Sequence, residues 1–194
     1  SRACKKMEPF FPDLRYYDAY YEPFLGGGSV ALHITKKYPK LKIIVNDLYE
    51  PLYNFWLRLQ VDGDYVHSQL QQLKSRFPDR GSARGLFEDA KEKLYDLDVS
   101  DKDRAVCFYI INKCSFSGLT ESSSFSEQAS DANFSMRGID KLPVYSKLIK
   151  DWYITNVDYH HLLGDKEKTF VYLDPPYDIK AVSYTHLTLP TKNE

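Results

Sequence analysis

The chain has 194 residues, a length that fits one domain or one domain with an insertion. Hydrophobic residues make up 43% of the sequence and charged residues 27%, as expected for a globular protein. The net charge of -1 excludes a chain that is basic as a whole, so DNA binding would have to use a local patch.

Two strand-and-helix units are predicted at the start of the chain. Asp18–Phe24 is rich in aromatic residues, reads as a strand and is followed by three glycines. Ser29–Tyr38 then has the pattern of a helix, with Ser29 as its expected N-cap. The β-branched run Lys42–Asp47 predicts a buried parallel strand, and Leu48–Val61 predicts a second helix. This alternation is typical of a doubly wound α/β sheet.

The alternation is then interrupted by a predicted insertion over residues 62–150. Gly81–Leu97 and Ser100–Cys114 have helical periodicity, and Ser100 is the expected cap of the second helix. The strand patterns resume at Asp151–Tyr159 and Thr169–Leu173, with a short helical piece, 160–168, between them. A mostly helical segment is therefore inserted between the second and third strands of the sheet.

The end of the insertion, Ser115–Leu142, is rich in serine and poor in aliphatic residues. One interpretation is a linker without regular structure. The other is a loop that becomes ordered on a partner, because Ser, Asn, Thr and Arg often contact phosphates. The sequence favours neither interpretation.

The three glycines form a turn that suits a ligand. Glycines let a ligand approach the backbone, and the start of the following helix offers unpaired amides. Asp47 follows Gly26 by 21 residues, at the end of the second strand, where an acid can bind ribose hydroxyls. A nicotinamide cofactor would fit both features. However, Glu22 precedes the turn, and a carboxylate there would repel a pyrophosphate but attract a cationic ligand.

The run Asp174-Pro175-Pro176-Tyr177 follows the last predicted strand. Prolines lack the amide that a sheet needs, so they end the strand pairing. The Asp174 carboxylate and the Pro175 carbonyl are two acceptors that suit an amino group on an aromatic ring. Hydrogen bonds to both amine protons leave the nitrogen lone pair free, and Tyr177 can stack on the ring. We favour this amine clamp over the alternative, a proline-ended turn with a core tyrosine.

The remaining features predict the compartment and the absence of a metal. No apolar run reaches the roughly 18 residues of a membrane span, and no signal peptide is visible. Cys4, Cys107 and Cys114 have neither a paired framework nor metal-ligand spacing, and His160-His161 has no partner ligand nearby. We therefore expect a cytoplasmic protein with free thiols and no metal.

Four segments in this order, EPFLGGGSV, VND, NVDY and LDPPY, resemble the Dam-like (class alpha) adenine-specific DNA methyltransferases. The resemblance covers nearly all of Glu8–Lys180, and INKCSFSGL within it resembles the Asn-rich hairpin that this family places near DNA. It implies a Rossmann-like sheet that uses S-adenosylmethionine, with the insertion as a target-recognition segment. The expected parts are residues 1–61 and 151–181 for the methyltransferase domain and 62–150 for recognition of double-stranded DNA.

The resemblance also implies roles for individual residues. Asp47 would hold the ribose hydroxyls, Asp158 the adenine amine of the cofactor, and Tyr177 the flipped target base. The implied cofactor-binding residues are Glu22, Pro23, Phe24, Gly26, Gly28, Asp47, Asp158, Tyr159 and Asp174. The implied catalytic residues are Asp174, Pro175, Pro176 and Tyr177. The implied DNA-binding residues are Asn112, Lys113, Ser115, Ser117 and Arg137. A basic cluster, Lys74, Arg76, Arg80 and Arg84, would either contact phosphates or form a solvated helix face.

Both ends differ from the family pattern. The chain starts after the position of the family's Gly-Gly-Lys segment, and residues 182–194 resemble a translated sequencing adapter. We therefore expect a fragment that is truncated at both ends. We also expect a monomer from a bacterium or a phage-infected host. Three alternatives remain: an inactive DNA- or cofactor-binding fragment, a methyltransferase acting on cytosine, RNA or protein, and a nicotinamide-dependent oxidoreductase.

Overall fold

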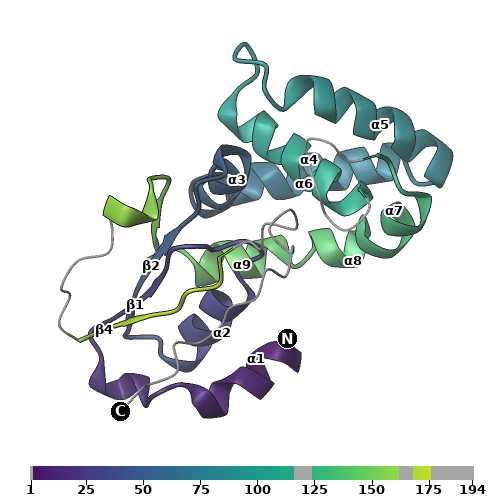
Figure 1. Ribbon diagram of the computed structural model, residues 1–194. Coiled ribbons are helices and arrows are strands. Elements are labelled where there is room, and N and C mark those ends of the chain that lie inside the picture. The colour runs from purple at the N-terminus through teal and green to yellow at the C-terminus, as the bar shows by residue number, and fades with distance from the viewer. Residues whose placement is uncertain (1, 116–123, 162–167, 176–194) are drawn as a thin grey trace, which may run out of the picture.

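The computed structural model describes residues 2–115, 124–161 and 168–175. Among these residues, four strands form one parallel sheet in the order β3-β2-β1-β4 (Figure 1). The strands are β1 (Ala19–Glu22), β2 (Lys42–Asn46), β3 (Tyr153–Thr155) and β4 (Thr169–Val171). The predicted α/β class is confirmed, and each predicted strand is present over a shorter range.

The central strand β1 is buried on both faces, which is characteristic of parallel sheets covered on two sides. Tyr20 and Tyr21 point to opposite faces and are both fully buried. Tyr20 lies in register with Ile43 of β2 and with Phe170 of β4. The chain runs outward from β1 to β2 and β3 and then returns to the other side of β1 with β4. The strand order therefore reverses at β1, the place where open α/β sheets bind their ligands.

The segments of the sheet half include three α-helices, α1 (Arg2–Met7), α2 (Ser29–Lys37) and α3 (Glu50–Val61). Three single turns accompany them, η1 (Glu8–Phe10), η2 (Leu14–Tyr16) and η4 (Tyr159–His161). The predicted N-cap of α2 is wrong by one residue, because Gly28 and not Ser29 occupies that position. The Gly28 carbonyl already accepts the first helical hydrogen bond, from the Leu32 amide at 2.9 Å, so Ser29 lies inside the helix.

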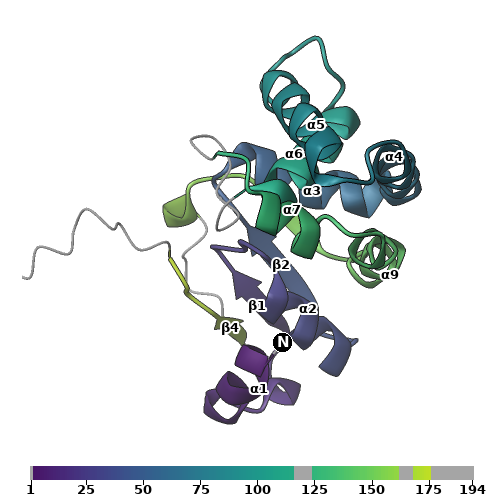
Figure 2. The same cartoon turned by 90° about the vertical axis from the view of Figure 1, so that its right-hand side faces the viewer.

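The inserted segment is helical, as predicted. Its helices are α4 (Gly63–Arg76), α5 (Arg80–Lys93), α6 (Asp101–Cys114), α7 (Glu127–Asn133), α8 (Met136–Ile139) and α9 (Leu142–Leu148). Ser100 caps α6 by accepting a hydrogen bond from the Asp103 amide, as expected. Helix α6 is the centre of the insertion, since it packs against α3, α4, α5 and α7. In both views α4 to α7 lie at the end of the molecule opposite to α1 (Figures 1 and 2).

The described part of the serine-rich segment is not an unstructured linker. Ser126 and Ser135 are N-caps, and their hydroxyls accept hydrogen bonds from the Ala129 and Gly138 amides at 3.2 and 3.3 Å. Phe134 and Ile139 are fully buried and attach the two short helices to the core. The linker interpretation was wrong here because capping serines and loop serines look alike in sequence. Ser117 lies outside the described residues.

Two further features concern the described residues alone. None of their helices is long and apolar enough to cross a membrane. They contain no group of three or more His, Cys, Asp or Glu side chains that could hold a metal ion. The three cysteines are buried and form no disulfide, in agreement with the predicted thiols.

Candidate functional site

A cavity of about 730 Å³ lies at the carboxyl ends of the strands. It is built from the turn between β1 and α2, the residues after β2 and β3, and Asp174 after β4. The residues predicted to bind the cofactor all line it: Glu22, Pro23, Phe24, Gly26, Gly28, Asp47, Asp158, Tyr159 and Asp174. The fold therefore brings together side chains that are up to 152 positions apart in the sequence (174 minus 22). We call this cavity the acidic pocket, since the described residues of its lining include four carboxylates and no Lys or Arg.

The glycine turn has the backbone geometry that only glycine adopts easily. Gly26 and Gly28 have φ angles of 49° and 63°, in the left-handed region. The indole nitrogen of Trp56 donates to the Gly26 carbonyl at 3.1 Å, which fixes the turn against α3. A Cβ at Gly26 or Gly27 would meet nothing within 4 Å, so the backbone is open at these two residues.

Gly28→Ala is expected to destabilise the protein by about 1–3 kcal/mol, the cost of a left-handed non-glycine residue plus a steric clash. Its Cβ would lie 2.7 Å from a ring carbon of Trp56, whose indole is already held by Gly26. Gly27→Ala is the matched control, because that Cβ meets nothing and φ is not positive. Urea unfolding of both variants tests this, and equal stability of the two would contradict it.

Asp47 lies where β2 ends and faces the glycine turn. One carboxylate oxygen accepts a hydrogen bond from the Gly26 amide at 2.9 Å, and the other accepts one from the Tyr49 amide at 3.0 Å. Each oxygen keeps further lone pairs for a ligand. The spacing between the glycines and the acid, read from the sequence, thus corresponds to a direct contact.

The far wall of the acidic pocket comes from the segment after β3. The rings of Phe24 and Tyr159 lie 5.1 Å apart, so the loops after β1 and β3 meet here. An oxygen of Asp158 accepts a hydrogen bond from the His160 amide at 2.9 Å and lies 2.7 Å from His160 Nδ1. His160 was expected to have only a surface or packing role, and its contact with Asp158 was not predicted.

Glu22 is the buried acid of the pocket, with 2% of its surface exposed. The fully buried Tyr20 hydroxyl donates to Glu22 Oε2 at 2.7 Å. The pKa of the Glu22 carboxyl is raised to about 7, chiefly because the group is buried. Hydrogen bonds from Tyr20 and the Ala31 amide oppose this rise, and the nearby Asp174 charge adds to it. The site therefore holds a carboxyl group that gains from a positive charge placed beside it.

Asp174 and Pro175 are exposed just past β4, as predicted for a turn that ends a strand. The Tyr172 amide donates to the Tyr21 carbonyl at 2.8 Å and extends the pairing of β4 with β1 by one residue. Beyond it, the Asp174 side chain lines the same pocket as Glu22. Pro176 and Tyr177 lie outside the described residues, so their predicted roles stay predictions.

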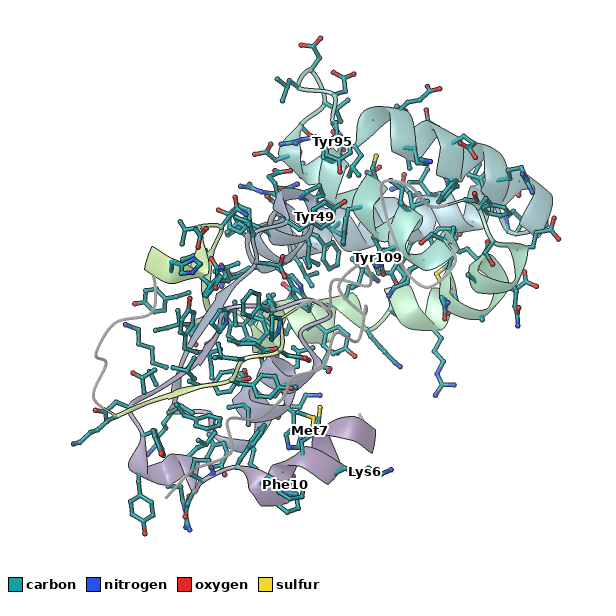
Figure 3. The ribbon with its side chains drawn as sticks, in the orientation of Figure 1. Lys6, Met7, Phe10, Tyr49, Tyr95 and Tyr109 are labelled. Carbon is teal, nitrogen blue, oxygen red and sulfur yellow. The ribbon has the colours of Figure 1, made fainter. Side chains whose placement is uncertain are left out.

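A second cavity, of about 1030 Å³, adjoins the first at Gly26, Gly27, Ser29 and Tyr49. We call it the basic pocket, because Lys36, Lys113, Arg137 and Lys141 line it and no Asp or Glu lines it within the part of the chain that the structure describes. Tyr49 and Tyr109, labelled in Figure 3, also contribute to its wall. Partial burial lowers the pKa of Lys113.

The predicted DNA-binding residues divide into two groups. Asn112, Lys113 and Arg137 lie together in the basic pocket, where Lys36 and Lys141 join them without having been predicted. Ser115, by contrast, is 1% exposed and forms the isolated bridge with Phe125. The sequence predicted a helix with lysines in its last turn. It did not predict that this helix, α2, lies beside the insertion.

The other basic cluster lies elsewhere, at the junction of α4 and α5. Lys74 Nζ lies 5.1 Å from the Phe134 ring centre, and Arg84 lies 5.0 Å from that of Phe125 and 4.0 Å from a Glu127 oxygen. Neither side chain lines the two pockets described here. Lys74 and Arg84 thus lie over Phe134 and Phe125 of the serine-rich segment.

A parallel sheet with a glycine turn and an acid at adjacent strand ends defines the Rossmann-like class of fold. Within this class, the chain belongs to the D12 class N6 adenine-specific DNA methyltransferase family, whose model matches residues 2–193. A relative is the type II methyltransferase M.MjaIII of Methanocaldococcus jannaschii, 28% identical over 193 residues. The match covers 87% of this chain and 62% of the relative, so the chain spans less than two thirds of that protein.

Proposed function

We propose that this protein transfers a methyl group from S-adenosylmethionine to the exocyclic amine of adenine in a specific DNA sequence. Membership of the D12 class supports the reaction type. The observation that carries the proposal is the acidic pocket, whose four carboxylates and lack of Lys and Arg suit a cationic nucleoside. The same charges would repel a pyrophosphate, which disfavours the nicotinamide alternative.

The residues of the pocket fit the proposed methyl donor part by part. Its sulfonium centre is a cation, which the buried Glu22 carboxylate would stabilise. Asp47 would accept hydrogen bonds from the ribose hydroxyls, and Asp158 would accept one from the adenine amine. Tyr159 would lie alongside the adenine ring, and Phe24, whose ring contacts that of Tyr159, would shape the pocket for the methionine half. When bound, the donor supplies an electrophilic methyl group, and no metal is needed.

The target amine would be bound at Asp174 and Pro175. The adenine would leave the DNA stack, and its amine would donate one hydrogen bond to the Asp174 carboxylate and one to the Pro175 carbonyl. These bonds keep the nitrogen lone pair available and orient it for an in-line reaction. As positive charge develops on the nitrogen, the Asp174 carboxylate stabilises it. Tyr177 is proposed to stack on the base.

The proposed partner is double-stranded DNA, and the basic pocket supports a contact with its phosphates. Lys36, Lys113, Arg137 and Lys141 provide positive charge beside the acidic pocket although the net charge of the chain is -1. We propose a monomer that acts in the cytoplasm, with restriction protection as one setting for this chemistry.

Asp47→Ala is expected to weaken S-adenosylmethionine binding by about 1–3 kcal/mol, the cost of unpairing ribose hydroxyls. The variant also loses the acceptor for the Gly26 amide, so its stability must be measured in parallel. Equilibrium dialysis with labelled cofactor gives the affinity. An unchanged affinity would remove Asp47 from the cofactor site.

The decisive experiment is methyl transfer from labelled S-adenosylmethionine to unmethylated, mixed-sequence DNA, followed by nucleoside analysis. Label on N6-methyladenine supports the proposal. Label on cytosine, or on RNA or protein offered in place of DNA, would replace it with the corresponding amine methyltransferase. Binding of S-adenosylmethionine without methyl transfer would identify the chain as a binding fragment. Binding of NAD in place of S-adenosylmethionine would identify an oxidoreductase.

A further inference from the structure

Asn46 occupies the middle of the Val45-Asn46-Asp47 segment, yet the proposed reaction gives it no role. It is the last residue of β2 and is 1% exposed. We propose that Asn46 is a positioning residue that ties the loop after β1 to the loop after β3 and so sets the shape of the acidic pocket. This inference rests on the proposed function of that pocket.

The amide group of Asn46 uses its whole hydrogen-bonding capacity. Its Nδ2 donates to the Pro23 carbonyl at 3.1 Å and to the Val157 carbonyl at 3.0 Å. Its Oδ1 accepts from the Val157 amide at 3.0 Å and from the Thr155 hydroxyl at 2.8 Å. A primary amide has two donor hydrogens and two acceptor positions, so all four are occupied. In addition, its backbone carbonyl accepts from the Leu25 amide at 2.9 Å.

The topology of the sheet explains why such a residue is needed. In the order β3-β2-β1-β4, strands β1 and β3 are not neighbours, so their own ladder hydrogen bonds cannot join the loops that follow them. Strand β2 lies between them, and its last side chain reaches both. Pro23 is followed by Phe24, and Val157 is followed by Asp158 and Tyr159, which are wall residues of the pocket.

The chemistry also specifies the residue type. Both Nδ2 partners are buried or half-buried carbonyl oxygens, which need donors. An aspartate has the same shape but accepts only, so its second oxygen would face two carbonyl oxygens. A leucine would leave both carbonyls unpaired. The site therefore requires a planar group with two donors and two acceptors.

The test compares Asn46→Asp with Asn54→Asp as a matched control. Asn54 is also buried, and its Nδ2 donates to the Asp101 carbonyl at 2.8 Å, but it lies on α3 and lines neither pocket. The affinities for S-adenosylmethionine and for S-adenosylhomocysteine are measured by calorimetry at pH 8 on protein shown to be folded by circular dichroism. Asn46→Asp is expected to weaken the affinity for S-adenosylhomocysteine by about 10- to 100-fold, because this ligand carries the adenosine that the two loops enclose. The affinity for S-adenosylmethionine is expected to fall by a smaller factor, because the new carboxylate lines the pocket and attracts the sulfonium. Asn54→Asp is expected to lower Tm but to keep both affinities within about threefold.

A pH series distinguishes the missing donor from a general loss of structure. A protonated aspartic acid donates one hydrogen bond, so the Asn46→Asp variant is expected to regain part of its affinity for S-adenosylhomocysteine as the pH falls. The thioether is used here because it carries no sulfonium charge to interact with Glu22. The wild-type protein is expected to show no such gain.

Three results would overturn the inference: an Asn46→Asp affinity for S-adenosylhomocysteine within about threefold of wild type, an equal loss of that affinity in Asn54→Asp, or no recovery of it at low pH. If Asn46→Asp does not fold, Thr155→Val decides, because it removes one donor to Oδ1 and leaves both Nδ2 hydrogen bonds in place. The same hydroxyl also lies 3.3 Å from the Val45 carbonyl oxygen within the β2–β3 pair. A loss of at least twofold in both affinities supports the inference, and no loss overturns it. If the wild-type protein binds neither ligand, the proposed function fails and the inference fails with it.

Discussion

Asp174→Ala is expected to abolish methyl transfer while cofactor affinity stays within about tenfold of wild type. The reason is that the exposed Asp174 carboxylate is proposed to bind the target amine, while other residues of the pocket are proposed to hold the cofactor. The carboxylate is one of the two acceptors proposed to orient the target amine, and it is exposed just past β4. Without this carboxylate, the amine is held by one acceptor only, and the positive charge that develops on its nitrogen is not stabilised. The measurement is single-turnover transfer from labelled S-adenosylmethionine, with the affinity determined separately.

Asp151→Ala is the matched control for this variant. Asp151 is another exposed carboxylate near a strand, but it precedes β3 at the opposite edge of the sheet and lies 3.8 Å from Lys150. Its replacement is expected to leave transfer unchanged. Normal turnover in Asp174→Ala would refute the amine-clamp account, and equal losses in both variants would point to a general effect of removing a carboxylate.

Glu22→Gln is expected to weaken S-adenosylmethionine binding at pH 8 by about 10- to 100-fold, because the sulfonium loses its interaction with a buried carboxylate. Binding of S-adenosylhomocysteine, which has no sulfonium, should change by less than about threefold. For the wild type, affinity for the cation is expected to fall as the pH drops below about 7, where Glu22 takes up a proton. The variant should lack this pH dependence. Equal losses for both ligands would exclude a role for the Glu22 charge.

The same raised pKa predicts an effect on stability, with a definite sign. The pKa of Glu22 is about 7 in the folded protein and 4.5 in an exposed reference, so the folded state holds the proton more tightly. Its stabilising contribution is fully present below pH 4.5 and is lost as the pH rises through about 7. Without cofactor, Glu22→Gln should therefore gain about 1–3 kcal/mol in unfolding free energy relative to wild type between pH 5 and pH 8. Urea unfolding at the two pH values measures this difference, and no change between them would contradict it.

Local patterns predicted the elements that carry the site. The β-branched run before Asp47, the glycines before α2 and the prolines after β4 each specify a strand end or a turn through backbone preferences alone. The 21-residue interval from Gly26 to Asp47 predicted an acid near the glycine turn, because one helix and one strand return the chain to the same edge of the sheet. The hydrogen bond between the two residues was found only in the structure. The mis-assigned cap at Ser29 shows the limit of this approach, since a left-handed Gly28 and a capping serine are compatible with the same letters.

The sequence by itself thus determined the class of fold, the strand ends that hold the acids and the family to which the chain belongs. Only the tertiary structure decided which side chains meet across strands that are not adjacent. Asn46 bridges two loops more than a hundred positions apart, the Glu22 carboxyl is buried, and Lys36 and Lys113 line the same basic pocket. These relations depend on strand order and burial, which arise from packing over the whole chain and leave no local pattern in the residues themselves.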